Sequence, residues 1–421
     1  MSQDAATAPT PTAIRPAEHA AGTDRALDAR ALYAALAGLC ASLVAIGLAR
    51  FAYTPLIPPL IHAHWFTAAD TVTLSAANFA GYFAGALFGR PIAARLSNRH
   101  ALRWLMVAAT AAFFACAFPV STSWYFVWRF LSGLSGGAIM VLVATAILPH
   151  IAPARRGFVS GMIFLGLGLG IAASGTLVPA LLTLGLRETW LGLGALSLVL
   201  TALSWFGWPT TDAPAGTPAS PAGHPEIGAA LRAERPTLRL LSLQYAANAL
   251  GLVPAMVLLV DYVARGLGQG PNVGAGYWVL YGVAAIAGPL VSGFMGDRMG
   301  FRNAYRLALL LQALAVAALA LWDGPVAIVA ATIVLGAFTP GVVPLMLGRV
   351  HDTLPHDPSA QRAAWSRVTS AFALFQVLAG YGYSYLFAHT HENYALIFAC
   401  GAVAMVVAFA ADFLVREPAI A

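Results

Sequence analysis

Lysine is absent from this 421-residue sequence, and charged side chains of either sign are scarce. Only 10% of the residues are charged, against roughly 25% in a typical soluble domain. By contrast 59% are hydrophobic, and many apolar runs exceed the ~18 residues that indicate a membrane-spanning helix. The composition therefore excludes a large soluble protein and indicates one that lies in the lipid bilayer.

Cysteine is also rare. Cys40, Cys116 and Cys400 all fall in apolar segments, which indicates small core residues rather than a disulfide framework. Histidine pairs such as His62 and His64 come near predicted helix ends and have no convergent third and fourth ligands, so we expect no metal site. Since no nucleophile–base pair or nucleotide-binding motif occurs, we expect neither an enzyme nor a bound cofactor.

Apolar segments do occur in number, and each is close to the ~20 residues that a bilayer-spanning helix needs. There are twelve: 31–60, 71–92, 101–120, 123–149, 157–184, 188–208, 238–263, 273–296, 303–322, 325–348, 363–388 and 392–415. Their Ala, Gly and Leu content, without polar alternation, favours helices over a barrel. We therefore predict an all-α integral membrane protein with twelve transmembrane helices.

One long polar break, rich in Pro, Ala and Gly, divides the chain into six helices plus six. The predicted parts are a disordered cytoplasmic tail (1–30), an N-terminal six-helix bundle (31–208), a cytoplasmic linker (209–237), a C-terminal six-helix bundle (238–416) and a short cytoplasmic tail (417–421). The first tail lacks the apolar core and cleavage site of a signal peptide.

Arginine placement predicts the orientation in the membrane. If the N-terminus is cytoplasmic, 19 of the 23 arginines fall in inward-facing tails, loops and helix ends, and only Arg187 and Arg265 face outward. This is the positive-inside pattern. We expect a multi-pass protein of the bacterial inner membrane with both termini cytoplasmic. The net charge of +6 then serves topology and leaflet attraction, so no nucleic acid partner is expected.

The two halves look like a duplication. Between the eighth and ninth segments the chain reads GFMGDRMGFRNAY (Gly293–Tyr305), and six segments earlier RPIAARLSNRHAL (Arg90–Leu102) occupies the equivalent loop. Arg95 aligns with Arg298, while Ala94 stands in place of Asp297 and Ser97 in place of Gly300. Glycine permits a tight turn that brings two helices together.

These loops resemble the signature of the major facilitator superfamily, and the resemblance extends over nearly the whole chain. RFLSGLSGGA (Arg129–Ala138) is similar to the family's fourth helix, Gly161–Gly175 to its glycine-rich fifth, and GLARFAYTPLIPPL (Gly47–Leu60) to the first helix of the YbfB/YjiJ branch. The resemblance implies two pseudo-symmetric six-helix bundles that rock about a midplane substrate site. It also implies an inner gate, latched by Arg95, Asp297, Arg298 and Arg302.

Arg50 and Arg129 are the two arginines left inside the spans, at similar predicted depths on helices one and four. Either could snorkel to the interface or cap carbonyl groups. Alternatively they form an anion clamp, because a guanidinium fits a carboxylate or phosphate bidentately. No carboxylate falls mid-membrane in the first half, and Asp261 and Asp412 come only near helix ends in the second. Unpaired arginines in a low-dielectric cavity favour an anionic ligand.

Further polar residues are candidates to line the cavity. Tyr53 follows Arg50 by three residues and is predicted to share its face. Pro55, Pro58 and Pro59 are expected to break the first helix at its outer end, and Pro254, Pro340 and Pro344 to interrupt two later helices. The remaining candidates for the cavity, each also open to an interhelical hydrogen bond instead, are Asn78, Tyr82, Gln244, Asn248, Tyr281 and Gln376. Asp261 is the proton-coupling candidate, with a surface cap or ion pair to Arg265 as the alternative.

Three hypotheses follow. The first is a secondary transporter, expected to be monomeric, that moves a small organic anion by alternating access with proton coupling or by exchange. The second is a proton-driven drug or metabolite exporter of the same fold, in which Arg50 is structural. The third, a non-transporting membrane sensor, is disfavoured because the tails and the linker offer no output module.

Overall fold

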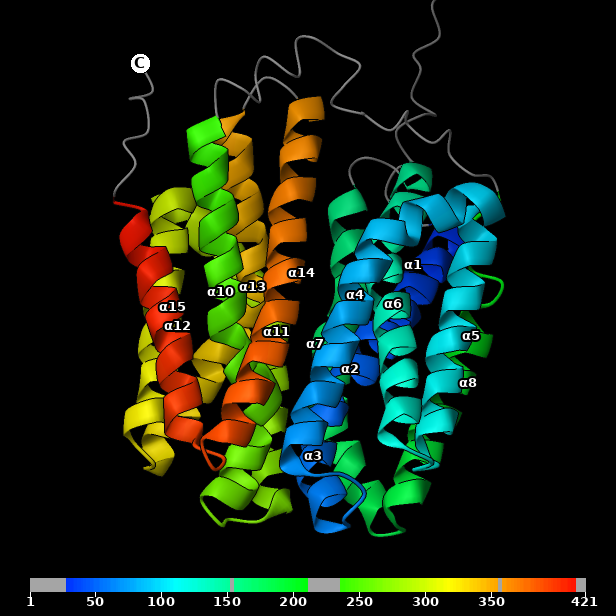
Figure 1. Cartoon of the computed structure of the whole chain (residues 1–421). Coiled ribbons are helices and arrows are strands. Elements are labelled where there is room, and N and C mark those ends of the chain that lie inside the picture. The colour runs from blue at the N-terminus through cyan, green and yellow to red at the C-terminus, as the bar shows by residue number, and fades with distance from the viewer. Residues whose placement is uncertain (1–27, 152–154, 211–234, 355–357, 414–421) are drawn as a thin grey trace, which may run out of the picture.

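The computed structural model describes residues 28–151, 155–210, 235–354 and 358–413 (Figure 1). The predicted linker (209–237) and N-terminal tail (1–30) fall mainly outside these residues, and the C-terminal tail (417–421) falls wholly outside them. Within the described ranges every regular element is helical, as the composition predicts.

The first half of the chain begins with an interrupted helix made of four consecutive pieces. These are α1 (Ala29–Ser42), the π-helix η1 (Leu43–Leu48), α2 (Ala49–Phe51) and α3 (Tyr53–His62). The longer helices of this half are α4 (Ala68–Leu96), α5 (Asn98–Cys116), α6 (Thr122–Ile147), α7 (Arg156–Leu182) and α8 (Leu186–Ser204). A short 3₁₀ turn, η2 (Leu148–His150), extends α6.

The second half repeats this order. Its elements are α10 (Arg235–Asp261), the π-helix η4 (Tyr262–Gly266), α11 (Pro271–Met299), α12 (Phe301–Leu321), α13 (Pro325–Thr353), α14 (Pro358–His389) and α15 (Tyr394–Ala411). In the described part of the chain eleven helices are long and apolar enough to cross a membrane. With α5, whose first turns carry Arg99 and Arg103, they match the twelve predicted segments.

Proline does not end the helices where we expected. Pro58 and Pro59 lie inside α3, Pro254 inside α10, and Pro340 and Pro344 inside α13, so the predicted breaks at these prolines are wrong. Pro55 lies in the first turn of α3, three residues after the turn at Ala52, and does not end the helix. A membrane helix tolerates proline because neighbouring groups or a small local adjustment satisfy the carbonyl that proline frees. The first helix is interrupted upstream instead, by η1 and by a turn at Ala52.

The backbone preserves the duplication where the sequence has lost it. Ser97 in the α4–α5 turn has φ +70° and ψ 152°, and Gly300 in the α11–α12 turn has φ +77° and ψ 148°. Glycine adopts a positive φ at little cost, whereas serine does so only under constraint from its surroundings. The equivalent turn has therefore kept its conformation after losing its glycine.

Close helix contacts are duplicated too. A Cβ added at Gly133 of α6 would overlap the carbonyl oxygen of Asn78 on α4, and one added at Gly336 of α13 would overlap that of Tyr281 on α11. Small residues let membrane helices approach backbone to backbone. These contacts place Asn78 and Tyr281 at equivalent positions of the two halves, as the alignment of the loops predicts.

The two ends of the molecule differ in charge. We call the end that holds the α4–α5 and α11–α12 turns the arginine-rich end, and the opposite end, which holds the α3–α4 turn, the arginine-poor end (Figure 1). Arg187, at the start of α8, and Arg265, in η4, lie at the arginine-poor end.

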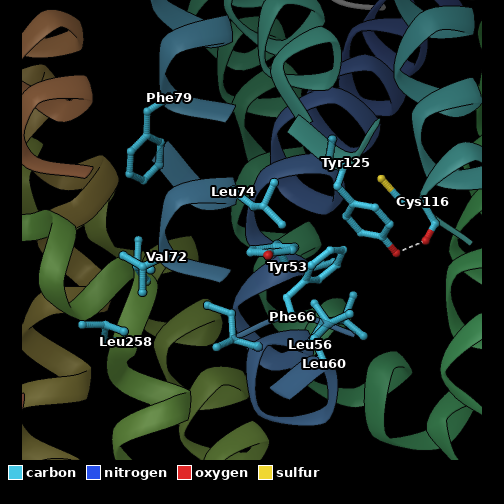
Figure 2. Close-up of a cluster of buried hydrophobic side chains, with 14 of the residues drawn as sticks. Tyr53, Leu56, Leu60, Phe66, Val72, Leu74, Phe79, Cys116, Tyr125 and Leu258 are labelled. Carbon is cyan, nitrogen blue, oxygen red and sulfur yellow. Dashed lines mark hydrogen bonds between the residues drawn. The ribbon is translucent and has the colours of Figure 1, made fainter. Parts of the chain in front are cut away.

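Two apolar cores join the halves: one packs Ile46 and Phe51 of the first half against Trp278 of the second, and the other lies at the arginine-poor end. This second core joins residues such as Leu56 and Val72 of the first half to Val257, Leu258 and Phe387 of the second, and Figure 2 shows Val72 beside Leu258. Toward the arginine-rich end each half has its own core, one built from the first half alone and one from the second alone. The halves are therefore packed together at the arginine-poor end.

Uncharged hydrogen bonds cross the same junction. The hydroxyls of Thr73 (α4) and Ser384 (α14) are 2.6 Å apart, and Ser384 also donates to the carbonyl of Ala69 at 3.1 Å. Thr54 of α3 donates to the carbonyl of Met256 on α10 at 2.8 Å. Because none of these groups is charged, the junction closes without burying an ion pair, which would carry a large desolvation cost.

Candidate functional site

Arg50 lies on α2, immediately after the π-helix. There α1 and η1 pack tightly on α7, because a Cβ at Gly47 would come within 2.8 Å of the Gly170 Cα. π-Helical segments inside α-helices are frequent at functional sites. Arg50 lies in the second half of the first span (Ala29–His62) and reaches the other half of the protein at Gln376.

Aromatic rings surround the Arg50 guanidinium. Its Cζ lies 4.5 Å from the ring centre of Phe79, 5.2 Å from that of Tyr82 and 5.5 Å from that of Phe51. Nη2 donates to Oε1 of Gln376, on α14 of the other half, at 3.0 Å. The buried Nε has no hydrogen-bond partner. A buried donor without an acceptor costs free energy. Nε is therefore available to a bound ligand, which would supply the missing acceptor.

Arg129, on α6, is more deeply buried, with 3% of its surface exposed. Its Nη1 donates to the Ala49 carbonyl at 2.6 Å, and its Cζ lies 4.2 Å from the ring centre of Tyr53. Its Nε is also buried and unpaired. We predicted that Tyr53 would sit beside Arg50. Instead its ring packs on Arg129, because the turn at Ala52 interrupts the helical spacing.

Both arginines line one small pocket, whose cavity volume of about 10 Å³ has room for about one water molecule. Asn78 donates from Nδ2 to the Ser132 hydroxyl at 2.9 Å, while its buried Oδ1 has no partner. The other lining residues are Phe51, Thr54, Ser75 and Phe79 from the first half and Met256 and Val257 from the second. No carboxylate lines the pocket, and among the residues the structure describes neither arginine makes an ion pair. The pocket therefore combines positive charge, unused donors and one unused acceptor.

Gln244 and Asn248, two other predicted cavity residues, lie instead within the second half. Gln244 donates to Asp412 at 2.9 Å, and Asn248 donates to Gln312 of α12 at 3.1 Å. Both are fully buried on α10 and neither lines the pocket. These are the interhelical hydrogen bonds that the sequence left open as the alternative.

Tyr281 is fully buried and stacks on Trp278 with ring centres 4.8 Å apart. Its hydroxyl is paired with that of Thr339. Trp278 in turn donates to the Ser174 hydroxyl on α7 at 3.1 Å. The Tyr281–Trp278 stack therefore belongs to the contact between the two halves.

Asp261, at the end of α10, is fully buried, which rules out the surface cap considered above. Its carboxylate lies 3.2 Å from Arg265 Nε and accepts a hydrogen bond from the Tyr394 hydroxyl at 2.6 Å. Arg265 also pairs with the more exposed Glu392. The ion pair between Asp261 and Arg265, the other alternative considered above, is therefore present at the arginine-poor end, and its carboxylate is buried.

The predicted gating residues do not form one cluster. Arg95 and Asp297 are exposed, and within the described segments Asp297 makes no ion pair. Arg298 stacks on Phe294 at 4.3 Å. Arg302 lies 3.4 Å from the carboxylate of Asp412, a residue that the sequence analysis noted only as near a helix end.

Asp412 is the centre of a network that the sequence did not reveal. Its carboxylate pairs with Arg349 of α13 and with Arg306 of α12, as well as with Arg302 and Gln244. Burial alone would raise the pKa of Asp412, but Arg349 and the hydrogen bonds from Gln244 and Arg306 outweigh burial and lower that pKa to about 2. The network ties α10, α12, α13 and α15 together at the arginine-rich end.

The fold and the pocket together define a class of protein. An all-helical, multi-pass membrane protein with two six-helix bundles joined around a polar pocket has the architecture of a major facilitator transporter. Residues 42–413 match the sequence model of the family described as the uncharacterised MFS-type transporter YbfB, so the chain belongs to that family. It is a membrane transporter and not an enzyme. A search of curated proteins found no match.

Solved transporter structures share the fold at low sequence identity. A variant of the nucleoside transporter NupG superposes with a TM-score of 0.73 at 13% identity, over 92% of this chain and 100% of that one. A D-xylose–proton symporter gives 0.69 at 16% identity, over 90% and 96%. An inward-facing, unoccupied bacterial homologue of the human lysosomal transporter Spinster gives 0.69 at 17%, over 92% and 97%. Identities this low establish the fold alone.

Proposed function

We propose that this transporter moves a small organic anion, with Arg50 as the main anion ligand and Arg129 as the second. One observation carries the proposal: two buried arginines, each with an unpaired Nε, line one pocket that has no carboxylate. Burying an uncompensated charge costs roughly several kcal/mol. A carboxylate or phosphate would recover part of that cost by accepting from both guanidinium groups.

The remaining pocket residues have the chemistry to contact a small organic solute, although the pocket, which here has room for about one water molecule, would have to widen to admit it. Phe79 and Phe51 supply apolar surface, and the free Oδ1 of Asn78 accepts a hydrogen bond from a ligand donor such as a hydroxyl. Tyr82 contributes its ring next to Arg50. Gln244, Asn248 and Tyr281 would support the site through helix packing rather than by contact.

The positive-inside pattern favours a cytoplasmic arginine-rich end, cytoplasmic termini and a bacterial inner membrane as the location. The packed arginine-poor end would then face outward, so the transporter here is closed to the outside. Arg95, Asp297 and Arg298 would meet at the inner gate when the bundles close there, with Arg302 held near by Asp412. Asp261 is the proposed proton carrier, because it is a fully buried carboxylate of the second half that pairs with one arginine, whereas the equally buried Asp412 pairs with three.

The ligand class is tested by the thermal stability of the purified protein with panels of carboxylates, quaternary amines and neutral sugars. A ligand that binds the folded state raises the melting temperature, and at equal concentration a tighter ligand raises it more. We expect carboxylates alone to stabilise the protein. Stabilisation by sugars or amines to the same extent would overturn the proposal and favour the alternative, a drug or metabolite exporter.

A further inference from the structure

Gln376 connects the two bundles through the substrate site. Of the side-chain hydrogen bonds that cross between the halves in the described residues, the one from Arg50 to Gln376 is the only one that involves a charged group. Gln376 is 3% exposed, and its Oε1 accepts from Arg50 Nη2 at 3.0 Å. The contact is made entirely by the protein.

The position of this bond on the guanidinium matters. Nε and Nη2 form the side-on fork that binds a carboxylate with two parallel hydrogen bonds. Nε is unpaired, and Nη2 is the atom that Gln376 engages. An anion that takes this fork therefore competes with Gln376 for Nη2, and the Gln376 amide oxygen stands in for one carboxylate oxygen.

This competition affects the return step, in which the transporter without substrate closes its bundles at the arginine-poor end. A buried arginine without an acceptor is costly, so closing the bundles over an unpartnered Arg50 would be opposed by its desolvation. Gln376 supplies an uncharged acceptor from the opposite bundle at the moment of closure. The rings of Phe79 and Tyr82 add cation–π contacts that also need no ligand.

We propose that Gln376 is the internal acceptor for Arg50 that lets the unloaded transporter close at its arginine-poor end, and therefore allows net transport rather than obligatory exchange. The inference rests on the proposed anion site, since it is the anion that displaces Gln376. It assigns Gln376 a positioning role toward Arg50 in the return step, rather than a role as the principal ligand.

The test measures closure directly, with no anion present. Thr73→Cys and Ser384→Cys, introduced after the native cysteines are replaced by alanine, report closure by forming a disulfide, because the native hydroxyls are 2.6 Å apart. In this background Gln376→Met keeps the side-chain length but removes the acceptor. We expect the disulfide to form about tenfold more slowly, as loss of a hydrogen bond to a charged group implies.

A second variant separates pairing from packing. In Arg50→Leu/Gln376→Met no charge needs an acceptor, so the rate should return to within about twofold of the parent rate. The proposal is overturned if Gln376→Met cross-links as fast as the parent, or if the double variant remains slow. Equal thermal stability of the variants excludes misfolding. Since the assay contains no anion, its failure leaves the anion-binding proposal standing, and that proposal fails only in the stability panel.

Discussion

Arg50→Ala is expected to lower the affinity for the stabilising carboxylate by about 30-fold or more, and transport with it. A bidentate guanidinium–carboxylate pair in a desolvated pocket is worth roughly 2–5 kcal/mol when one partner is truncated, and each 1.4 kcal/mol, roughly, is a factor of ten. Arg50→Lys should recover only part of this loss, because an ammonium cannot reproduce the planar fork. Titration of the carboxylate into the purified variants measures the change.

Arg187→Ala is the matched control. Arg187 is also an arginine stacked on an aromatic ring, with its Cζ 4.6 Å from the ring centre of Phe118, but it lies outside the pocket at the arginine-poor end. Its replacement should leave the affinity unchanged. Equal losses in both variants would mean that Arg50 acts through general stability or surface charge, and the anion site would have to be placed elsewhere.

Asp412→Asn is expected to have the largest effect on stability. Arg349 is 3% exposed and pairs with Asp412, so removing the carboxylate charge takes a close counter-charge away from a buried guanidinium. Breaking a buried pair by removing one partner costs about 3–5 kcal/mol. Thermal unfolding in detergent measures the loss. Glu392→Gln, which breaks a partly exposed pair with Arg265, should cost only about 0–1 kcal/mol.

The same network predicts a dependence on pH. The folded pKa of Asp412, about 2, is below its ordinary value of 3.8. The carboxylate therefore stabilises the folded state fully above about pH 4, and this contribution is lost as the pH falls toward 2. The difference in stability between the native protein and Asp412→Asn should shrink over that interval. A difference that stays constant down to pH 2 would mean that Asp412 is not the group that titrates.

Hydropathy was enough to predict the helical spans, because a bilayer imposes length and apolarity on each one separately. The common location of Arg50 and Arg129 also followed from depth along the helices. The residues that contact these two arginines could not be predicted in this way. The turn at Ala52 moves Tyr53 to Arg129. Pro55, in the first turn of α3, is a local signal for a new helix start there, but it does not indicate which arginine Tyr53 contacts.

The sequence also does not indicate which neighbour a polar side chain contacts within a bundle. Gln244 and Asn248 are four residues apart on one face of α10, which is compatible with either the cavity or a neighbouring helix. The structure directs them to Asp412 and Gln312, in contacts between elements more than 60 residues apart in the chain. Likewise, nothing local to Gln376 indicates Arg50, 326 positions away, as its donor.

The most direct test of the central claim is a cryo-electron microscopy map of the native protein with the best-stabilising carboxylate. The account predicts carboxylate density in the pocket shared by the two arginines, within hydrogen-bonding distance of Arg50 Nε and Nη2, with Gln376 displaced from Nη2. Ligand density away from both arginines, with the Arg50–Gln376 bond intact, would contradict it.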